Sequence, residues 1–481
     1  MQGTLKDKTV GALVWNTVDK FLSYIAYAVV GIVLANLLSS DDFGLVGIVM
    51  AFAAFVNIFI EGGFTTALIQ KKDADETDYS TAFWFNVAAS TVMYVVMFFL
   101  SPFIADYFED DRLTLLCRVL FFNFIPVSLC IIQTSMLMRE MNVKRIAVIN
   151  ALSLFISGAA ALIVAWCGGG VWALVVQTLG ISLVKSVLFW SMSRWRPAFV
   201  FSLSSFRQVF SVGGFVLLYS FVNTFFLNIY SFIIGKLFSL SQLGYYTQAD
   251  KWSKMGYTAL SQITGYSFFP ALAGLQNEPE RMRRAFSKMN KTVYYLSLPV
   301  FSGLIIVAEP LFHLFFGTKW DASIVMFRLL TVKGLFYVVS GVLMNYINAT
   351  GRTRTTFRLE VVKDAVSLIA IFMTVRHGIV AIIWGQVAAG IIHFLLLSYM
   401  TSRITGYGLL RQASDFFPYL LQTAVIVALL LLLQSFFSGT VLMVVQMFAG
   451  FGLYFAMNGI LGSNIQREVF SRIPLLKKLY R

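Results

Sequence analysis

Apolar runs of roughly twenty residues recur along this chain from one end to the other, and they constrain its fold more than any other feature. The hydrocarbon core of a bilayer is ~30 Å thick, which a helix of ~20 apolar residues can cross. Of the 481 residues, 58% are hydrophobic and only 12% are charged, whereas soluble domains usually carry about 25% charged residues. No polar stretch is long enough to form a soluble domain. The sequence therefore predicts an all-α integral membrane protein.

Charged residues, prolines and glycine clusters interrupt the apolar sequence and divide it into about fourteen predicted transmembrane helices. Runs longer than the minimum permit a tilted span without fixing its angle. The weakest division is the Gly triplet that follows Cys167. The predicted spans are 10–36, 43–69, 79–105, 113–138, 146–167, 170–192, 208–235, 243–272, 292–316, 323–349, 356–375, 378–400, 415–436 and 439–461.

The basic residues are distributed unevenly between the two sides of the membrane that this count defines. With the N-terminus in the cytoplasm, cytoplasmic segments carry 25 of the 37 Lys and Arg residues, and the opposite segments carry 4. Because cytoplasmic loops are enriched in Lys and Arg, both termini are predicted to be cytoplasmic. The net charge of +14 is explained by this bias, so nucleic acid is not an expected partner. No signal peptide is predicted, since no short apolar region with a cleavage site opens the chain.

The two halves of the chain resemble each other. The segment VLANLLSSDDFG at 33–44 aligns with IIGKLFSLSQLG at 233–244, and later Lys185 aligns with His393. Six helices that pair with the next six keep the same orientation, so the repeats are expected to be parallel. The longer loop expected at 273–291 accounts for the change of offset. The predicted organisation is an N-terminal lobe (1–207), a C-terminal lobe (208–402) and two extra helices with a basic tail (403–481), with the lobes around a central cavity.

Polar and ionisable residues lie inside several predicted spans, although a charge there costs ~2.5–3.5 kcal/mol on insertion scales. Steps of three and four residues place Asn16 and Lys20 on one helix face, and Lys251 and Lys254 on another. Helices 1 and 2 correspond to helices 7 and 8 in the repeat, so these four helices are expected to line the cavity. The expected cavity residues are Asn16, Asp19, Lys20, Glu61, Asn223, Lys251 and Lys254.

Cations outnumber anions toward the middle of these faces, which suits a substrate that bears phosphate or carboxylate. The alternative is that these charges pair with other helices and serve packing alone. A second group of charges, in the tenth and eleventh spans, fits a coupling-ion site and a structural cluster equally well. Its members are Lys333, Glu360, Lys363 and Asp364.

Two segments resemble a known family. GFTTALIQKKDADETDYSTAFWFN at 63–86 is similar to the helix 2–3 connection of Wzx-type polysaccharide flippases, particularly the WzxC-like and teichuronic-acid export branch. LGYYTQADKW at 243–252 resembles the start of helix 8 in the same proteins, which belong to the MOP superfamily. The resemblance covers essentially the whole chain. It implies two six-helix lobes around a cavity, and export of a polyprenyl-pyrophosphate-linked oligosaccharide by alternating access.

The resemblance also implies a setting. The expected location is the bacterial cytoplasmic membrane, within O-antigen, capsule or exopolysaccharide biosynthesis. The expected partners are the lipid-linked oligosaccharide, the lipid bilayer and the polysaccharide polymerase machinery.

Two other functions are consistent with the same residues. A MATE-like small-molecule exporter would favour cationic substrates, and uncompensated carboxylates rather than lysines are then expected in the cavity. A membrane polysaccharide polymerase or glycosyltransferase would need a large external loop or paired carboxylates, whereas the acidic runs at 71–78 and 109–111 are interpreted as solvated loops. The sequence has no P-loop, and its three cysteines fit no metal spacing. We expect no cofactor, no metal and no enzymatic activity.

Overall fold

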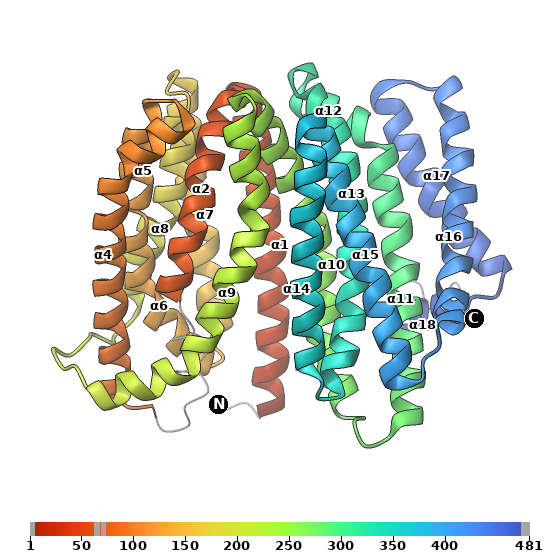
Figure 1. Cartoon of the computed structure of the whole chain (residues 1–481), viewed down its shortest axis with the longest axis horizontal. Helices are drawn as coiled ribbons and strands as arrows, with labels where there is room; N and C mark the ends of the chain where they lie inside the picture. Colours follow the sequence, from red (N-terminus) through yellow and green to blue (C-terminus); the bar gives the residue numbers. More distant parts are fainter. Residues whose placement is uncertain (1–4, 62–67, 69–73, 473–481) are drawn as a thin grey trace. The chain divides into compact units, whose positions relative to one another are not determined.

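The computed structural model describes residues 5–61, 68 and 74–472, and every regular element within them is a helix (Figure 1). The α-helices are α1 (Leu5–Leu37), α2 (Ser40–Glu61), α4 (Glu76–Phe108), α5 (Arg112–Phe121), α6 (Phe124–Arg139), α7 (Val143–Trp166), α8 (Trp172–Met192), α9 (Leu203–Leu237), α10 (Leu240–Ala273), α11 (Pro279–Ile306), α12 (Ala308–Phe316), α13 (Asp321–Ala349), α14 (Thr353–Thr374), α15 (Ile379–Thr405), α16 (Leu409–Leu432), α17 (Gly439–Ile460) and α18 (Asn464–Arg472). Three short 3-10 turns are η1 (Thr318–Trp320), η2 (Val375–His377) and η3 (Leu433–Ser435).

The described helices form a multi-pass membrane protein, as predicted. Eleven helical stretches are long and apolar enough to cross a bilayer, and the number is twelve if α11 and α12, bent by 61° at their junction, form one span. Helices α5 and α6 together make one of these stretches, Arg112–Arg139. The weakest predicted division is present, because α7 ends at Trp166 and α8 begins at Trp172. Gly168 and Gly170 between them have positive φ angles of 80° and 52°, which glycine adopts without strain.

Two of the fourteen predicted spans, α10 and α14, are not among these apolar stretches. Both are long helices, of 34 and 22 residues, but charged side chains interrupt their apolar sequence. α10 carries Asp250, Lys251 and Lys254, and α14 carries a run from Arg354 to Asp364 that includes five charges. The count of fourteen therefore stays a prediction.

The segment 273–291 is mostly helical, and our prediction of a loop there was wrong. α11 begins at Pro279 and extends the apolar span by more than three turns at its N-terminal end. Met282 and Phe286 are buried on one face of this extension. The opposite face is charged, and Arg281 pairs with Glu278 at 2.6 Å. An amphipathic helix with a high charge content was mistaken for a loop because only its buried face is apolar.

The chain divides into two compact units, Met1–Thr247 and Gln248–Arg481. In the first unit, α7 packs along α1 and α8, α4 packs along α5 and α6, and α2 packs along α9. In the second unit, α13 packs on α11 and α15, and α16 packs on α11 and α17. The predicted division into lobes at 207 and 402 stays a prediction.

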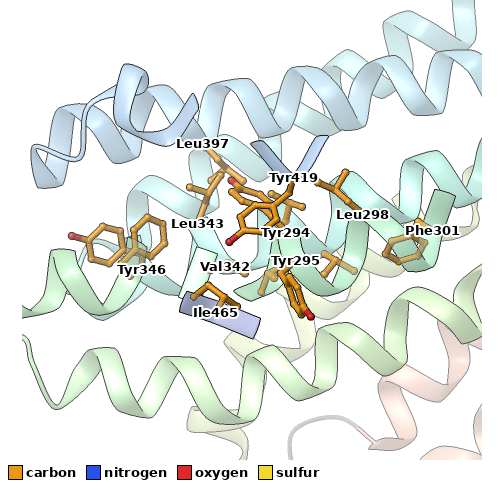
Figure 2. Close-up of a cluster of buried hydrophobic side chains, with 14 of the residues drawn as sticks. Tyr294, Tyr295, Leu298, Phe301, Val342, Leu343, Tyr346, Leu397, Tyr419 and Ile465 are labelled. Carbon is orange, nitrogen blue, oxygen red and sulfur yellow. The ribbon is translucent and has the colours of Figure 1, made fainter. Parts of the chain in front are cut away.

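A cluster of buried aromatic and aliphatic side chains forms the core of the second unit (Figure 2). Tyr294 and Tyr295 of α11 lie in it beside Tyr419 of α16. The Tyr454 hydroxyl of α17 donates to the Tyr295 carbonyl at 2.9 Å. The Tyr295 hydroxyl in turn donates to Gln466 Oε1 of α18 at 3.2 Å. Buried tyrosines need such partners, and these bonds attach α17 and α18 to α11.

The predicted repeat is visible at two helix junctions. α1 ends at Leu37 and α2 begins at Ser40, and 200 residues later α9 ends at Leu237 and α10 begins at Leu240. At the first junction, the Ser39 backbone N–H donates to Asp42 at 2.9 Å and the Asp42 N–H donates to the Ser39 hydroxyl at 3.2 Å. Ser239 and Gln242 make the same reciprocal pair of bonds at the second junction. Both junctions thus use a capping box.

Two glycines bring the starts of α2 and α10 into backbone contact. A Cβ added at Gly44 would lie 2.3 Å from the carbonyl oxygen of Leu240, and one added at Gly244 would lie 1.9 Å from that of Ser40. The two contacts are equivalent under the offset of 200 residues. Only glycine permits this approach at either position.

The acidic run 71–78 lies partly in the described residues. Asp75 precedes α4, and its side chain accepts a bond from the Asp78 N–H at 2.8 Å, while Asp78 accepts one from the Asp75 N–H at 3.1 Å. These carboxylates therefore cap α4. Residues 69–73 lie outside the described residues.

Candidate functional site

The polar face of α1 lies beside α7 and α8 in the first unit. Asp19 is buried, with 8% of its surface exposed, and both of its oxygens accept bonds from the Asn150 amide of α7 at 3.1 and 3.2 Å. Lys20 is exposed, and Asn16 is half-buried. Lys185 of α8 lies within electrostatic range of both Asp19 and Lys20. Asp19 thus has a packing partner as well as two neighbouring cations.

Two predicted cavity residues of the first unit lie on other helices. Glu61 ends α2, and its side chain lies outside the described part of the structure. Asn223 lies on α9 and is half-buried. Their place in the cavity stays a prediction.

The two predicted lysines of α10, in the second unit, have different surroundings. Lys254 pairs with Asp250 one turn earlier on the same helix, with 2.5 Å between Nζ and Oδ2. Lys251 lies half-buried with its ammonium 5.5 Å from the centre of the Trp252 ring. Lys251 makes no ion pair among the described residues. A cation–π contact is weaker than a salt bridge to a carboxylate in such a setting, so most of the Lys251 charge is uncompensated.

Lys333 of α13 belongs to the same electrostatic group. Its ammonium donates to Gln386 Oε1 of α15 at 2.8 Å, and this amide carries no charge. Asp250, Lys254 and Lys363 all lie within electrostatic range of Lys333. Lys333 was predicted to belong to a different group from the lysines of α10. The structure places Lys333 and Lys254 within electrostatic range in one unit.

The charged residues of α14 form a compact cluster with α15. Lys363 donates to Glu360 and lies 3.4 Å from Asp364. His393 Nε2 of α15 lies 3.6 Å from the other oxygen of Glu360. Asp364 and His393 are both buried, each with 6% of its surface exposed. Three of the four residues predicted as a second group, Glu360, Lys363 and Asp364, are therefore in contact, with the Lys363 ammonium between the two carboxylates.

Sequence reasoning missed four members of these groups. Asn150, Lys185, Gln386 and His393 were not among the expected site residues. Gln386 and His393 are seven residues apart in an otherwise apolar helix, so two polar side chains on one face were a readable signal. Lys185 and His393 are also aligned in the repeat, and each lies in the polar group of its own unit.

The arrangement suits the binding of an anion. Within residues 5–61, 68 and 74–472, no three His, Cys, Asp or Glu side chains are placed to hold a metal ion. The half-buried ammonium groups can form charge-assisted hydrogen bonds with phosphate or carboxylate oxygens. Ionisable groups on the helices of a multi-pass protein, as on α1, α10, α13 and α14 here, are typical of a membrane transporter.

The chain belongs to the polysaccharide biosynthesis protein family, whose model matches residues 33–325. It is 25% identical over 385 residues to the teichuronic acid biosynthesis protein TuaB of Bacillus subtilis, covering 79% of this chain and 80% of that protein. It is 24% identical over 425 residues to the lipopolysaccharide biosynthesis protein WzxC of Escherichia coli, covering 87% and 84%. The resemblance to Wzx-type flippases seen in the sequence is confirmed.

A solved structure shows the same fold. The lipid II flippase MurJ, in an inward closed conformation, superposes with a TM-score of 0.75 at 15% sequence identity. The match covers 94% of this chain and 98% of MurJ. The all-helical membrane architecture predicted from the sequence is therefore that of a known transporter fold.

Proposed function

We propose that this protein is a flippase, which moves a polyprenyl-pyrophosphate-linked oligosaccharide from the inner to the outer leaflet by alternating access. The polysaccharide biosynthesis family and the fold shared with a lipid II flippase support this substrate class. The observation that carries the proposal is that neither Lys251 nor Lys333 of the second unit forms an ion pair among the described residues. Cations without carboxylate partners in a half-buried setting attract the phosphates of such a substrate.

The alternative exporter of small cations fits these residues less well. Asp250 and Glu360 are already paired with Lys254 and Lys363. A cationic drug would have to displace these ammonium groups. A polymerase or glycosyltransferase would require a free pair of catalytic carboxylates, whereas Asp250 and Glu360 are each paired with a lysine.

The setting of the proposed function is the bacterial cytoplasmic membrane, with both termini in the cytoplasm. The proposed partners are the lipid-linked oligosaccharide, the bilayer and the polysaccharide polymerase that uses the exported unit. The positive charge of the cytoplasmic segments supports this orientation.

The decisive test is complementation of a bacterial strain that lacks its polysaccharide flippase. The readout is the accessibility of the lipid-linked oligosaccharide at the outer leaflet. We expect the precursor to accumulate inside without this gene and to reach the outer leaflet with it. If the precursor reaches the outer leaflet in both strains but stays unfinished without the gene, the protein is an enzyme.

Lys251 provides a sharper test with matched variants. Lys251→Met removes an uncompensated charge, and loss of one charge-assisted contact worth about 1.5–3 kcal/mol should slow export roughly 10- to 100-fold. Lys251→Arg keeps the charge and should retain export. Membrane abundance of both variants should match the wild type. Equal export by all three proteins would rule out a role for Lys251 in substrate binding.

A further inference from the structure

A polar hollow of about 660 Å³ lies in the second unit, at the end where α11 and α16 begin and α17 ends. Its walls come from one face each of α11, α16 and the α17–α18 region. None of the proposed substrate-binding residues lines it. The inference drawn from it does not depend on the flippase function.

The hollow is lined by three cations of α11, spaced four and three residues apart on one face. Lys288 pairs with Glu468 of α18 at 2.6 Å, and Lys291 pairs with Asp415 of α16 at 3.0 Å. Arg284, the third, is exposed and has no ion pair among the described residues. The lining therefore carries one positive charge in excess, on a guanidinium that can bind phosphate with two parallel bonds.

Two buried amide oxygens, on residues that line the same hollow, accept no hydrogen bond among the described residues, although the Asn458 amide N–H donates to the Tyr454 carbonyl at 3.0 Å. Gln422 of α16 is 8% exposed and Asn458 of α17 is fully buried. Gln422 Oε1 and Asn458 Oδ1 find no donor in the part of the chain that the structure describes. An unpaired buried acceptor is destabilising, so a ligand that supplies donors would be favoured there.

An apolar hollow lies farther along the same three helices. It has a volume of about 130 Å³, and its lining includes Val300 of α11, Leu430 of α16 and Met447 of α17. The polar hollow is lined by neighbouring positions on each helix, such as Lys291 on α11, Gln422 on α16 and Asn458 on α17. A ligand with a polar head and an apolar chain fits a polar hollow beside an apolar one better than a soluble anion does.

We propose that the polar hollow binds a phosphodiester headgroup with free hydroxyls, as in phosphatidylglycerol. The phosphate lies at Arg284, and the hydroxyls donate to Gln422 and Asn458. Under the proposed orientation this end of the unit faces the cytoplasmic leaflet. A bound lipid would therefore join α11 to α16 and α17.

Native mass spectrometry of the full-length, delipidated protein in detergent tests the proposal. The probes are phosphatidylglycerol, phosphatidylcholine and inorganic phosphate. We expect the wild type to retain phosphatidylglycerol and not phosphatidylcholine. Arg284→Gln should weaken that retention roughly five- to tenfold. Arg281→Gln is the matched control, since Arg281 lies on the same helix, pairs with Glu278 and does not line the hollow.

Gln422→Leu gives a second variant, which removes the acceptor and keeps a side chain of similar size. Its melting temperature without lipid reports whether it folds, and its retention of phosphatidylglycerol should fall.

If inorganic phosphate alone raises the melting temperature of the wild type and not of Arg284→Gln, the same site takes a free phosphate. Equal retention by the wild type and both variants, or equal binding of phosphatidylcholine, would overturn the proposal.

Discussion

Lys254 and Asp250 form an ion pair within α10, and this pairing decides how each lysine of the helix responds to mutation. An exposed pair of this spacing is worth only about 0.3–0.5 kcal/mol. A carboxylate left unpaired inside a span costs more, about 2.5–3.5 kcal/mol on insertion scales. Removal of Lys254 therefore acts mainly through the Asp250 that it leaves behind.

We expect Lys254→Met to lower the stability of the protein by about 2 kcal/mol, because Asp250 loses its partner. The double variant Asp250→Asn/Lys254→Met should recover most of this loss. Fluorescence-detected size exclusion after heating measures both. If single and double variants melt together, Asp250 has another partner or faces water.

Residue pairs close in sequence were predictable, and distant ones were not. The spacing of Asp250 and Lys254 indicates their contact directly, since residues four apart are neighbours on a helix. Asp19 was identified as a buried charge, but its partner Asn150 is 131 residues away. The proximity of Lys333 to Asp250 also depends on how α13 packs, which no local pattern specifies.

At the scale of helices, the starts of α2 and α10 depend on Gly44 and Gly244. We expect Gly244→Ala to destabilise the protein by about 1–3 kcal/mol or more, because the new Cβ would overlap the Ser40 carbonyl. Gly256→Ala on the same helix meets only Leu304, at 3.7 Å, and should be neutral or slightly stabilising. Melting temperatures in detergent give the comparison. A tolerated Gly244→Ala would mean that the two helices separate readily.

The α14–α15 cluster is expected to be structural. Glu360 accepts a bond from Lys363 on one oxygen, His393 Nε2 lies 3.6 Å from the other, and the Lys363 ammonium lies between the Glu360 and Asp364 carboxylates. Glu360→Gln should therefore lower stability by about 3 kcal/mol, since it leaves a half-buried pair incomplete. Export per folded molecule should match the wild type in the outer-leaflet assay. Loss of export at normal stability would instead identify the cluster as a coupling site.

Helix boundaries were predicted well where apolar runs ended at glycine or at charges. The predictions were wrong where a helix continued beyond its apolar part, as α11 does, and where one span contained a break. The predicted span 113–138 is broken at Phe122 and Asn123 between α5 and α6. Pro126 lies four residues after Phe122 and cannot donate to the Phe122 carbonyl, so the break has a local signal that the predicted span overlooked.

For the molecule as a whole, the open question is whether α10 and α14 cross the membrane despite their charges. We expect single cysteines at Leu237 and His377 to react with an impermeant maleimide on intact cells. Cysteines at Gln276 and Arg352 should react only after permeabilisation. The background must lack Cys167, which is exposed, together with the other two cysteines. Labelling of the Gln276 position in intact cells would show that α10 does not span.

The class of protein and its fold were predictable because a bilayer imposes strong rules on composition and span length. Family membership was predictable from the motifs at 63–86 and 243–252. The second unit's polar hollow was not, because its lining comes from four helices, and nothing in the sequence marks Gln422 and Asn458 as residues with unpaired amide oxygens.

The glycine contacts between α2 and α10 also bear on how such a chain could arise. In a two-fold symmetric homodimer, residue i of one copy touches residue j of the other, and the reverse contact is identical. Ser40 with Gly244 and Leu240 with Gly44 have this relation. Equivalent residues meet only on the symmetry axis, and there Ser241 donates to Asp41. Two identical subunits would place two aspartates or two serines face to face, whereas one fused chain can place an aspartate opposite a serine.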